Sequence, residues 1–384
     1  MERCDVLIVG AGPAGSCCAW ALRESGLKVL LVDKATFPRD KVCAGWITPP
    51  LIDTLQIDLD EYRGGRILQP FTGFRVGMID GPDVVVRYDR VVSYGIRRCQ
   101  FDDYLRRRSG SECRLGEPVR RIERMPNEWI VNGTLSARVL VGAGGHFCPV
   151  ARFFGSGSSQ LPVVRAQEIE FSIPADSADA VASEPEVPEI FFCQDLEGYG
   201  WCVRKGEFLN IGLGRLDPAR LREHVQDFVR FLRERRGLRI TLPDRWHGHA
   251  YRIYERAAPK LIGDRALLIG DAAGLAYPRS GEGIRPAIES GLLAAKTILE
   301  ADGDYSLGKL QAYAKAIAQR FGEPPAGYWT EWLPTSLRRA VGRWLVGKSW
   351  FARGVVMNRW FLHTDQRALA PPSSLHSHSA SIPR

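Results

Sequence analysis

The chain has 384 residues, of which 45% are hydrophobic and 25% charged, and its net charge is +8. This balance is typical of a globular protein of two or three domains and excludes general disorder and collagen-like repeats. No apolar run reaches the roughly 18 residues that a membrane-spanning helix needs, and nine scattered cysteines without a CxxC pair do not indicate a disulfide scaffold. We therefore expect a cytoplasmic protein.

The first predicted elements form a dinucleotide-binding unit. A strand over residues 5–9 runs into GAGPAG, a helix follows to about residue 24, and a second strand over 28–32 ends in an acid. The first glycine permits a tight turn, the second lets a pyrophosphate approach the backbone, and the third allows close helix–strand packing. The acid would accept hydrogen bonds from ribose. The residues expected at this site are Gly10, Gly12, Pro13, Ala14, Gly15, Asp33 and Lys34.

Three later segments favour FAD over NAD as the dinucleotide. Residues 96–105 open a helix with Arg98 near its start, and 139–152 read as a buried strand that enters a glycine-rich turn. Residues 265–274 form another apolar strand and end in GDAAG. An extended FAD can use such a second strand–Gly–Asp turn, and the positive end of a following helix favours a reduced flavin. The expected contacts are Arg98, Gly270, Asp271, Gly281, Gly283 and Ile284.

With these segments together, the sequence resembles the FAD-dependent oxidoreductases related to aromatic hydroxylases. GAGPAG, the RxxFDxxL pattern at 98–105 and GDAAG at 270–274 carry the general resemblance. Two further segments are similar to the geranylgeranyl reductase branch. They are FPRDKVCAG at 37–45 and Tyr-Gly-Trp at 199–201, which Gly-Leu-Gly follows at 212–214.

The resemblance implies an enzyme that reduces carbon–carbon double bonds of an isoprenoid or other hydrophobic substrate by hydride transfer from reduced flavin. It implies that Cys43 lies beside the flavin, where its thiol is a candidate proton source, and that Tyr199 and Trp201 line the substrate cavity. The electron donor stays open between NADPH and another reductant. The residues alone also allow Cys43 to be a small buried side chain and the two aromatic residues to be core.

The same FAD-binding scaffold is also compatible with other activities. The runner-up is a monooxygenase, a hydroxylase that acts through a flavin C4a-hydroperoxide; a halogenase or a non-catalytic flavin-holding membrane-surface protein ranks lower. The chain also departs from the branch pattern. Val203 and Arg204 replace a Phe-Pro pair after the Tyr-x-Trp, and Gly144 replaces an acidic residue in the glycine-rich turn.

The predicted fold class is α/β, in part α+β. A discontinuous Rossmann-like FAD-binding domain over 1–60, 90–165 and 255–300 is interwoven with an antiparallel-sheet substrate domain over 61–89 and 166–254. A C-terminal helical region is expected over 301–370 and a disordered tail over 371–384.

Basic and aromatic residues gather in the last part of the chain. From residue 328 onward there are eight Lys and Arg against two Asp and Glu, and five of the ten tryptophans. This mixture fits peripheral contact with an anionic membrane as well as ordinary core packing, and we expect a hydrophobic small-molecule or lipid substrate and no nucleic acid. His247 and His249 lie two apart on a predicted strand face, a spacing that a metal could use, but with no carboxylate or cysteine partner evident for them we expect no metal site there.

Overall fold

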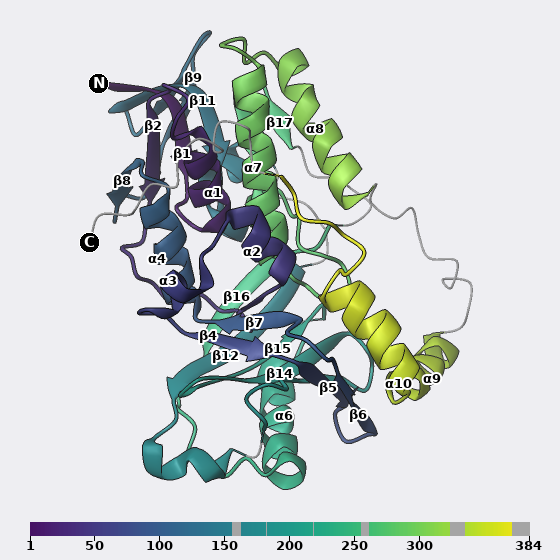
Figure 1. Ribbon diagram of the computed structural model, residues 1–384. Helices are drawn as coiled ribbons and strands as arrows, with labels where there is room; N and C mark the ends of the chain where they lie inside the picture. Colours follow the sequence, from purple (N-terminus) through teal and green to yellow (C-terminus); the bar gives the residue numbers. More distant parts are fainter. Residues whose placement is uncertain (156–162, 182, 218, 255–260, 323–334, 371–384) are drawn as a thin grey trace.

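The computed structural model describes residues 1–155, 163–181, 183–217, 219–254, 261–322 and 335–370. Two large sheets lie end to end. The sheet that contains the N-terminal strand forms the upper part of Figure 1, and the second sheet forms the lower part. The predicted tail over 371–384 lies outside the described residues.

The first sheet is largely parallel. Strands β18, β11, β1, β2 and β8 run side by side in this order, and all four neighbouring pairs are parallel. Strands β17 and β10 add antiparallel edges. The bounds are β1 (Glu2–Val9), β2 (Val29–Asp33), β8 (Glu112–Leu115), β9 (Ile122–Arg124), β10 (Trp129–Val131), β11 (Leu135–Gly142), β17 (Ile262–Gly263) and β18 (Ala266–Leu268).

The second sheet has seven strands in the order β16-β12-β15-β14-β13-β5-β6. It is antiparallel except at one pair, because β13 and β5 run parallel. Its strands are β5 (Gly73–Met78), β6 (Asp83–Arg87), β12 (Val163–Ser172), β13 (Glu189–Phe192), β14 (Gly198–Lys205), β15 (Phe208–Arg215) and β16 (His247–Arg252). A small sheet joins the two large ones through β3 (Trp46–Ile47), β4 (Leu68–Phe71) and β7 (Ser93–Ile96).

Helices cover both sheets. α1 and α7 pack together against the first sheet, whereas α6 lies along the second (Figure 1). The helices are α1 (Pro13–Leu22), α2 (Pro49–Leu55), α3 (Leu59–Arg63), α4 (Arg98–Arg108), α5 (Pro149–Phe153), α6 (Leu221–Arg236), α7 (Ile284–Glu300), α8 (Leu307–Phe321), α9 (Thr335–Val346) and α10 (Ser349–Phe351). Shorter turns are η1 (Gly145–Phe147), η2 (Ala175–Ala180) and η3 (Gly270–Ala272), and a π-helix, η5, spans Ala352–Phe361.

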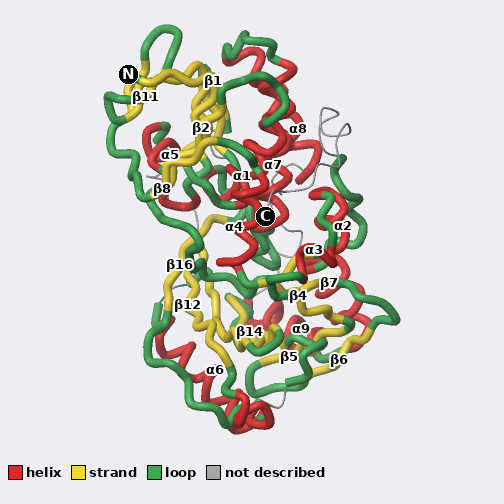
Figure 2. Tube along the Cα trace, turned by 60° about the vertical axis from the view of Figure 1, so that its left-hand side comes forward, coloured by secondary structure: helices red, strands yellow, loops and turns green. Residues whose placement is uncertain are grey.

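The two faces of the second sheet bury different partners. Because neighbouring side chains on a strand point to opposite faces, Cys202 packs with the apolar side of α6, whereas Trp201 and Val203 pack with η5 and Trp46. Figure 2 shows α6 beside β12 and β14, in the lower part of the molecule. The face that carries Trp201 is therefore covered by the C-terminal helices.

The structure confirms the predicted fold class: a parallel Rossmann-like sheet, a separate and mostly antiparallel sheet, and helices near the C-terminus. The predicted strand over 5–9 and helix to about residue 24 correspond to β1 and α1. Across the described residues, no helix combines the length and the hydropathy that a membrane span requires.

Candidate functional site

One cavity of 550 Å³ connects the two large sheets. It begins at the carboxyl ends of β1 and β2 and reaches the face of β14. Most of the residues singled out from the sequence lie on its wall: Gly10, Gly12, Pro13, Ala14, Asp33, Lys34, Cys43, Arg98, Tyr199, Trp201, Asp271, Gly281, Gly283 and Ile284. Gly15 and Gly270 are not among the lining residues.

The glycine turn after β1 is shaped by close backbone contacts. Gly10 has a φ of +116°, and a Cβ there would lie 2.3 Å from the carbonyl oxygen of Ala143. Gly15 allows α1 to pack closely against the turn, since a Cβ at this position would lie 1.9 Å from the carbonyl oxygen of Gly10. Gly12 precedes α1 and provides no side-chain cap. The first amides of α1 are therefore left for a ligand, as in anion sites at helix N-termini.

Asp33 is fixed by backbone amides. Its Oδ2 accepts a hydrogen bond from the amide of Ala11 at 2.8 Å, and Oδ1 accepts one from Ala35 at 2.8 Å. Each carboxylate oxygen can accept more than one hydrogen bond, so the carboxylate keeps capacity for a ribose hydroxyl while its position is set by the turn.

Arg98 is buried rather than a surface cation. Its Nε and Nη2 donate to the two carboxylate oxygens of Asp102 at 2.8 and 2.9 Å, and Arg39 approaches the same carboxylate at 3.3 Å. Although burial opposes the charged form, the charge of Asp102 raises the pKa of Arg98 above its ordinary value. Arg98 therefore places a permanent positive charge on the cavity wall.

Asp271 lies in a cluster with Lys41 and His249. Its Oδ2 is 3.9 Å from Nζ of Lys41 and 3.6 Å from Nε2 of His249. Burial alone would raise the pKa of Asp271, but hydrogen bonding by His249 and the charge of Lys41 lower it to about 2. Burial lowers the pKa of Lys41 to about 8. The sequence-based view of His249 as remote from any carboxylate was wrong, because the β12–β16 pairing and η3 bring it to Asp271.

The loop before α7 closes against the second sheet. Gly281 has a φ of +65°, and a Cβ there would lie 2.2 Å from the hydroxyl of Tyr251. The hydroxyl of Tyr199 donates to the carbonyl oxygen of Ser280. Gly283 precedes α7 without a side-chain cap. The cavity therefore ends at a second helix N-terminus, beside the aromatic residues of β14 and β16.

Hydrogen bonds hold Cys43 from two sides. Its amide donates to Oε2 of Glu168 at 2.6 Å, and its carbonyl oxygen accepts from Nδ2 of Asn210 at 3.3 Å. Oδ1 of Asn210 accepts from Nε1 of Trp201 at 2.7 Å. The ring of Trp201 lies 6.0 Å from that of Tyr199. One hydrogen-bonded chain therefore sets the position of the cysteine relative to the aromatic wall.

Glu168 should make stability depend on pH. Burial raises the pKa of this carboxyl to about 7 from an ordinary 4.5, although Lys205 and the Cys43 amide favour its charged form. The folded state then binds the proton more tightly than the unfolded state, so the contribution of Glu168 to stability is greatest below pH 4.5 and falls as pH rises to about 7.

We expect the free energy of unfolding of the wild type, relative to that of Glu168→Gln, to fall by roughly 2–3 kcal/mol across this range. Urea unfolding at several pH values measures this difference. Glu184→Gln, at an exposed ion pair with Arg87, is the control and should show no such slope. A wild-type and Glu168→Gln difference that stays constant with pH would contradict the assignment.

Sequence reasoning missed several cavity residues. Lys41 and Arg39 lie inside the FPRDKVCAG segment, and Glu282 lies inside GEGI, but the motifs there draw attention only to the cysteine and the glycines. Tyr251 follows His249 by two positions on β16, so the period of a strand could have placed both on one face. No local signal marks Glu168 or Asn210.

Similarity to known proteins agrees with this geometry. Residues 8–39 match the family model of the NAD(P)-binding Rossmann-like domain. The menaquinone reductase of Mycobacterium tuberculosis is 31% identical over 344 residues, which cover 84% of this chain and 81% of that protein. The digeranylgeranylglycerophospholipid reductase 3 of Methanosphaera stadtmanae is 27% identical over 351 residues and 84% of each chain.

Solved structures show the same fold. A geranylgeranyl bacteriochlorophyll reductase-like protein from Thermoplasma acidophilum has a TM-score of 0.71 at 23% identity, and the match covers 90% of this chain and 88% of that one. The halogenase PltM, crystallised with FAD, has a TM-score of 0.65 at 18% identity, with 83% and 74% covered.

Proposed function

The chain belongs to the geranylgeranyl reductase branch of the FAD-dependent oxidoreductases, and from this premise we propose that it saturates carbon–carbon double bonds in the isoprenoid part of a lipid or quinone. The observation that carries the proposal is the continuous cavity. It joins a dinucleotide-binding turn at one end to the aromatic pair Tyr199 and Trp201 at the other. Apolar cavities with a few fixed polar groups are typical of sites for small hydrophobic ligands.

The residues present fit FAD. Glycine at position 10 permits the tight turn against Ala143, the uncapped start of α1 suits a pyrophosphate, and Asp33 suits a ribose. Arg98 and Lys41 add positive charge midway along the cavity, and Asp271 lies beside them. When bound, FAD supplies the two-electron transfer that saturates the double bond.

Aromatic side chains of the protein line the end of the cavity where we place the substrate. Tyr199 and Trp201 present aromatic surface to the cavity, while their polar atoms are bonded to Ser280 and Asn210. An isoprenoid chain can then contact apolar ring surface without leaving these polar atoms unpaired. We propose that Cys43, held by the amide bond to Glu168, lies against the reacting part of the substrate.

The function is tested by anaerobic single turnover. The protein is reduced and mixed with detergent-solubilised menaquinone or digeranylgeranylglycerophospholipid. The reaction is followed by flavin absorbance and by mass spectrometry of fragments of the isoprenoid chain, because reduction of the quinone ring would also add two hydrogens. We expect reoxidation with the gain of two hydrogens per double bond. Protein kept oxidised is the control and should leave the lipid unchanged. Reoxidation that requires oxygen and yields a hydroxylated product would replace the reductase with a monooxygenase.

We further propose that the C-terminal helices contact an anionic membrane surface. Leu337, Val341 and Trp344 are exposed and recur at helical spacing on α9, and Trp350 follows with 64% of its surface exposed. Exposed basic residues occur on the same segment: Arg343, Arg353 and Arg359. Tryptophan with Arg or Lys is typical of a membrane interface. Because η5 packs on Trp201, this surface adjoins the substrate end of the cavity.

Removing these tryptophans should weaken membrane binding. The double variant Trp344→Ala/Trp350→Ala is expected to bind vesicles of phosphatidylglycerol and phosphatidylcholine at least tenfold more weakly in sedimentation assays, since each exposed side chain would lose roughly 1 kcal/mol or more of apolar burial. Phe153→Ala, an exposed aromatic residue on α5, is the matched control. Equal binding by both variants, or binding that salt does not weaken, would contradict the proposal.

A further inference from the structure

Glu282 places a carboxyl group on the cavity wall. It lies in the loop before α7, between Gly281 and Gly283, and lines the same cavity as Tyr199. Its Oε1 accepts a hydrogen bond from the amide of Arg285 at 3.1 Å. Its Oε2 is buried and has no hydrogen-bond partner within the described part of the chain. One oxygen of this carboxyl group is therefore fixed and the other is uncommitted.

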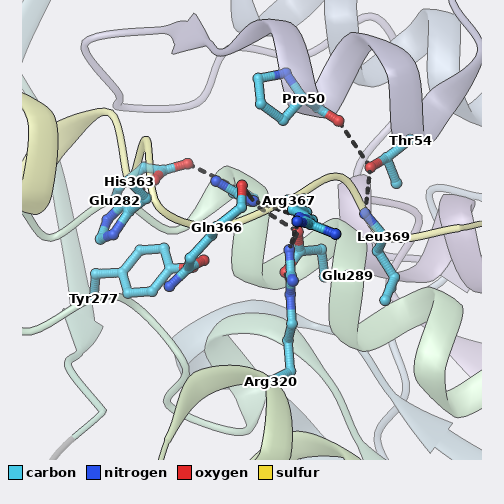
Figure 3. A network of polar contacts seen from close by, with 11 residues as sticks. Pro50, Thr54, Tyr277, Glu282, Glu289, Arg320, His363, Gln366, Arg367 and Leu369 are labelled. Carbon is cyan, nitrogen blue, oxygen red and sulfur yellow. Dashed lines mark hydrogen bonds and ion pairs between the residues drawn. The ribbon is translucent and has the colours of Figure 1, made fainter.

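The C-terminal segment closes over this carboxyl group. Nε2 of His363, also buried and without a hydrogen-bond partner among the described residues, lies 3.9 Å from Oε2 of Glu282. The imidazole stacks on Tyr277 with ring centroids 3.7 Å apart. Figure 3 shows His363 and Tyr277 next to Glu282. The C-terminal segment thus covers Oε2 of Glu282, while the residue as a whole also lines the cavity.

Several polar contacts hold the covering segment in place. The hydroxyl of Tyr277 donates to Oε1 of Gln366 at 2.7 Å, and Arg320 donates to the carbonyl oxygen of Arg367 at 2.7 Å. The amide of Leu369 donates to the hydroxyl of Thr54 at 3.1 Å (Figure 3). These bonds anchor the segment that follows His363.

Burial and the neighbouring positive charge shift the pKa of Glu282 in opposite directions. Burial raises its pKa to about 7, the positive charge of Arg285 opposes this rise, and Glu289 adds to it. The titratable and charged groups that face it from the packed elements are Tyr199 on β14, Tyr277 in its own loop, Arg285 and Glu289 on α7, Arg320 on α8 and His363 in the C-terminal segment. Burial lowers the pKa of His363 to about 4, so the imidazole is neutral when the carboxyl group titrates.

Saturating one double bond adds two electrons and two hydrogens. If bound reduced flavin supplied the electron pair with one hydrogen, the other hydrogen would have to arrive as a proton. Resting on the proposed function, we propose that Glu282 is the acid that donates this proton to the substrate. The O–H bond of its carboxyl group breaks, its electron pair stays on the carboxylate oxygen, and a C–H bond forms at the second alkene carbon.

Two other groups could compete for this role. Glu168 is buried as well, but its carboxylate accepts the Cys43 amide at 2.6 Å, and it is not among the residues that line the cavity. Cys43 lines the cavity, and its sulfur accepts a hydrogen bond from the amide of Gly45 at 3.4 Å. Among these three groups, only Glu282 combines a place on the cavity wall with an uncommitted buried oxygen.

The test uses the FAD-loaded full chain and isosteric variants. In anaerobic single turnover with digeranylgeranylglycerophospholipid, Glu282→Gln is expected to slow reoxidation at least 100-fold, the lower end of the effect of a general acid, while its flavin spectrum is unchanged. Glu282→Asp should retain turnover that falls as pH rises through neutrality. Glu300→Gln, at an exposed position of α7, is the matched control and should behave as wild type.

A second readout does not depend on turnover. Infrared difference spectra of the wild type between pH 6 and pH 8 are expected to show carbonyl bands of two protonated carboxylic acids, because burial raises the pKa of both Glu282 and Glu168 to about 7. Glu282→Gln should remove one band and Glu168→Gln the other. Difference spectra that Glu282→Gln leaves unchanged, or normal turnover by Glu282→Gln, overturn the assignment. If Cys43→Ser turns over slowly while Glu282→Gln turns over normally, the proton donor is Cys43 and not Glu282. A wild type that reduces neither menaquinone nor digeranylgeranylglycerophospholipid, with the band of Glu282 present, overturns the proposed function instead.

Discussion

Glu289→Gln is expected to destabilise the protein by about 3–5 kcal/mol, because it removes the charge that compensates a buried arginine. Glu289 is fully buried, and its carboxylate accepts hydrogen bonds from Arg285 at 2.9 Å and from Arg320 at 2.6 Å. Arg285 is itself 1% exposed. Without the carboxylate, its guanidinium would remain charged inside the fold. Urea unfolding of the FAD-loaded protein at pH 7 measures the loss.

Glu300→Gln separates this effect from a general effect of changing α7. Glu300 is exposed and forms an i,i+4 pair with Lys296 at 3.7 Å, so its replacement should change the free energy of unfolding by less than about 0.5 kcal/mol. Arg285 also donates to the carbonyl oxygens of Gln366 and Arg367. Glu289→Gln should therefore speed hydrogen exchange in that segment. Equal stability of the two variants would show that Arg285 finds another partner.

Among Gly→Ala substitutions in the nucleotide-binding turn, Gly10→Ala is expected to cause the largest loss of stability and of FAD binding. The added Cβ would lie 2.3 Å from the carbonyl oxygen of Ala143, a backbone atom that cannot move without separating β1 from β11. We expect a loss of stability above about 4 kcal/mol and at least tenfold weaker retention of FAD, which corresponds to about 1.4 kcal/mol. Thermal unfolding and the ratio of flavin to protein absorbance measure the two effects.

Gly133→Ala tests whether backbone conformation alone explains the effect at Gly10. Gly133 also has a positive φ, +71°, but nothing lies within 4 Å of its added Cβ, and it joins β10 to β11 away from the cavity. Its replacement should cost about 1–2 kcal/mol and leave FAD bound. If both variants retain flavin equally, the close approach to Ala143 does not shape the site.

Local sequence was sufficient for the nucleotide-binding part. The turn after β1, the acid that ends β2 and the Gly-Asp turn at η3 are each set by residues within a short span, because glycine alone tolerates the backbone conformation and the contacts found there. The same holds for Tyr199 and Trp201, which share a face because strand side chains alternate. A parallel Rossmann-like sheet and an FAD-type site could thus be predicted from these local patterns alone.

The partners of the charged groups could not be predicted in this way. Glu168 reaches Cys43 across 125 positions of the chain, and His249 reaches Asp271 only because β16 pairs with β12 at the edge of the second sheet. The parallel pairing of β13 with β5 likewise depends on where the chain returns to the sheet. Such contacts leave no periodic pattern in the sequence, since each depends on two distant segments meeting.

By itself, then, the sequence determined the elements and the cofactor class, because strand, turn and helix preferences act over a few residues. Tertiary structure alone decided which carboxyl groups are buried and which face the cavity. Glu282 illustrates this division. The glycines on either side of it mark the motif in the sequence, but Glu282 is buried because His363, more than 80 positions later in the chain, packs over it. Burial and neighbouring charge, rather than residue type, set the protonation of such groups.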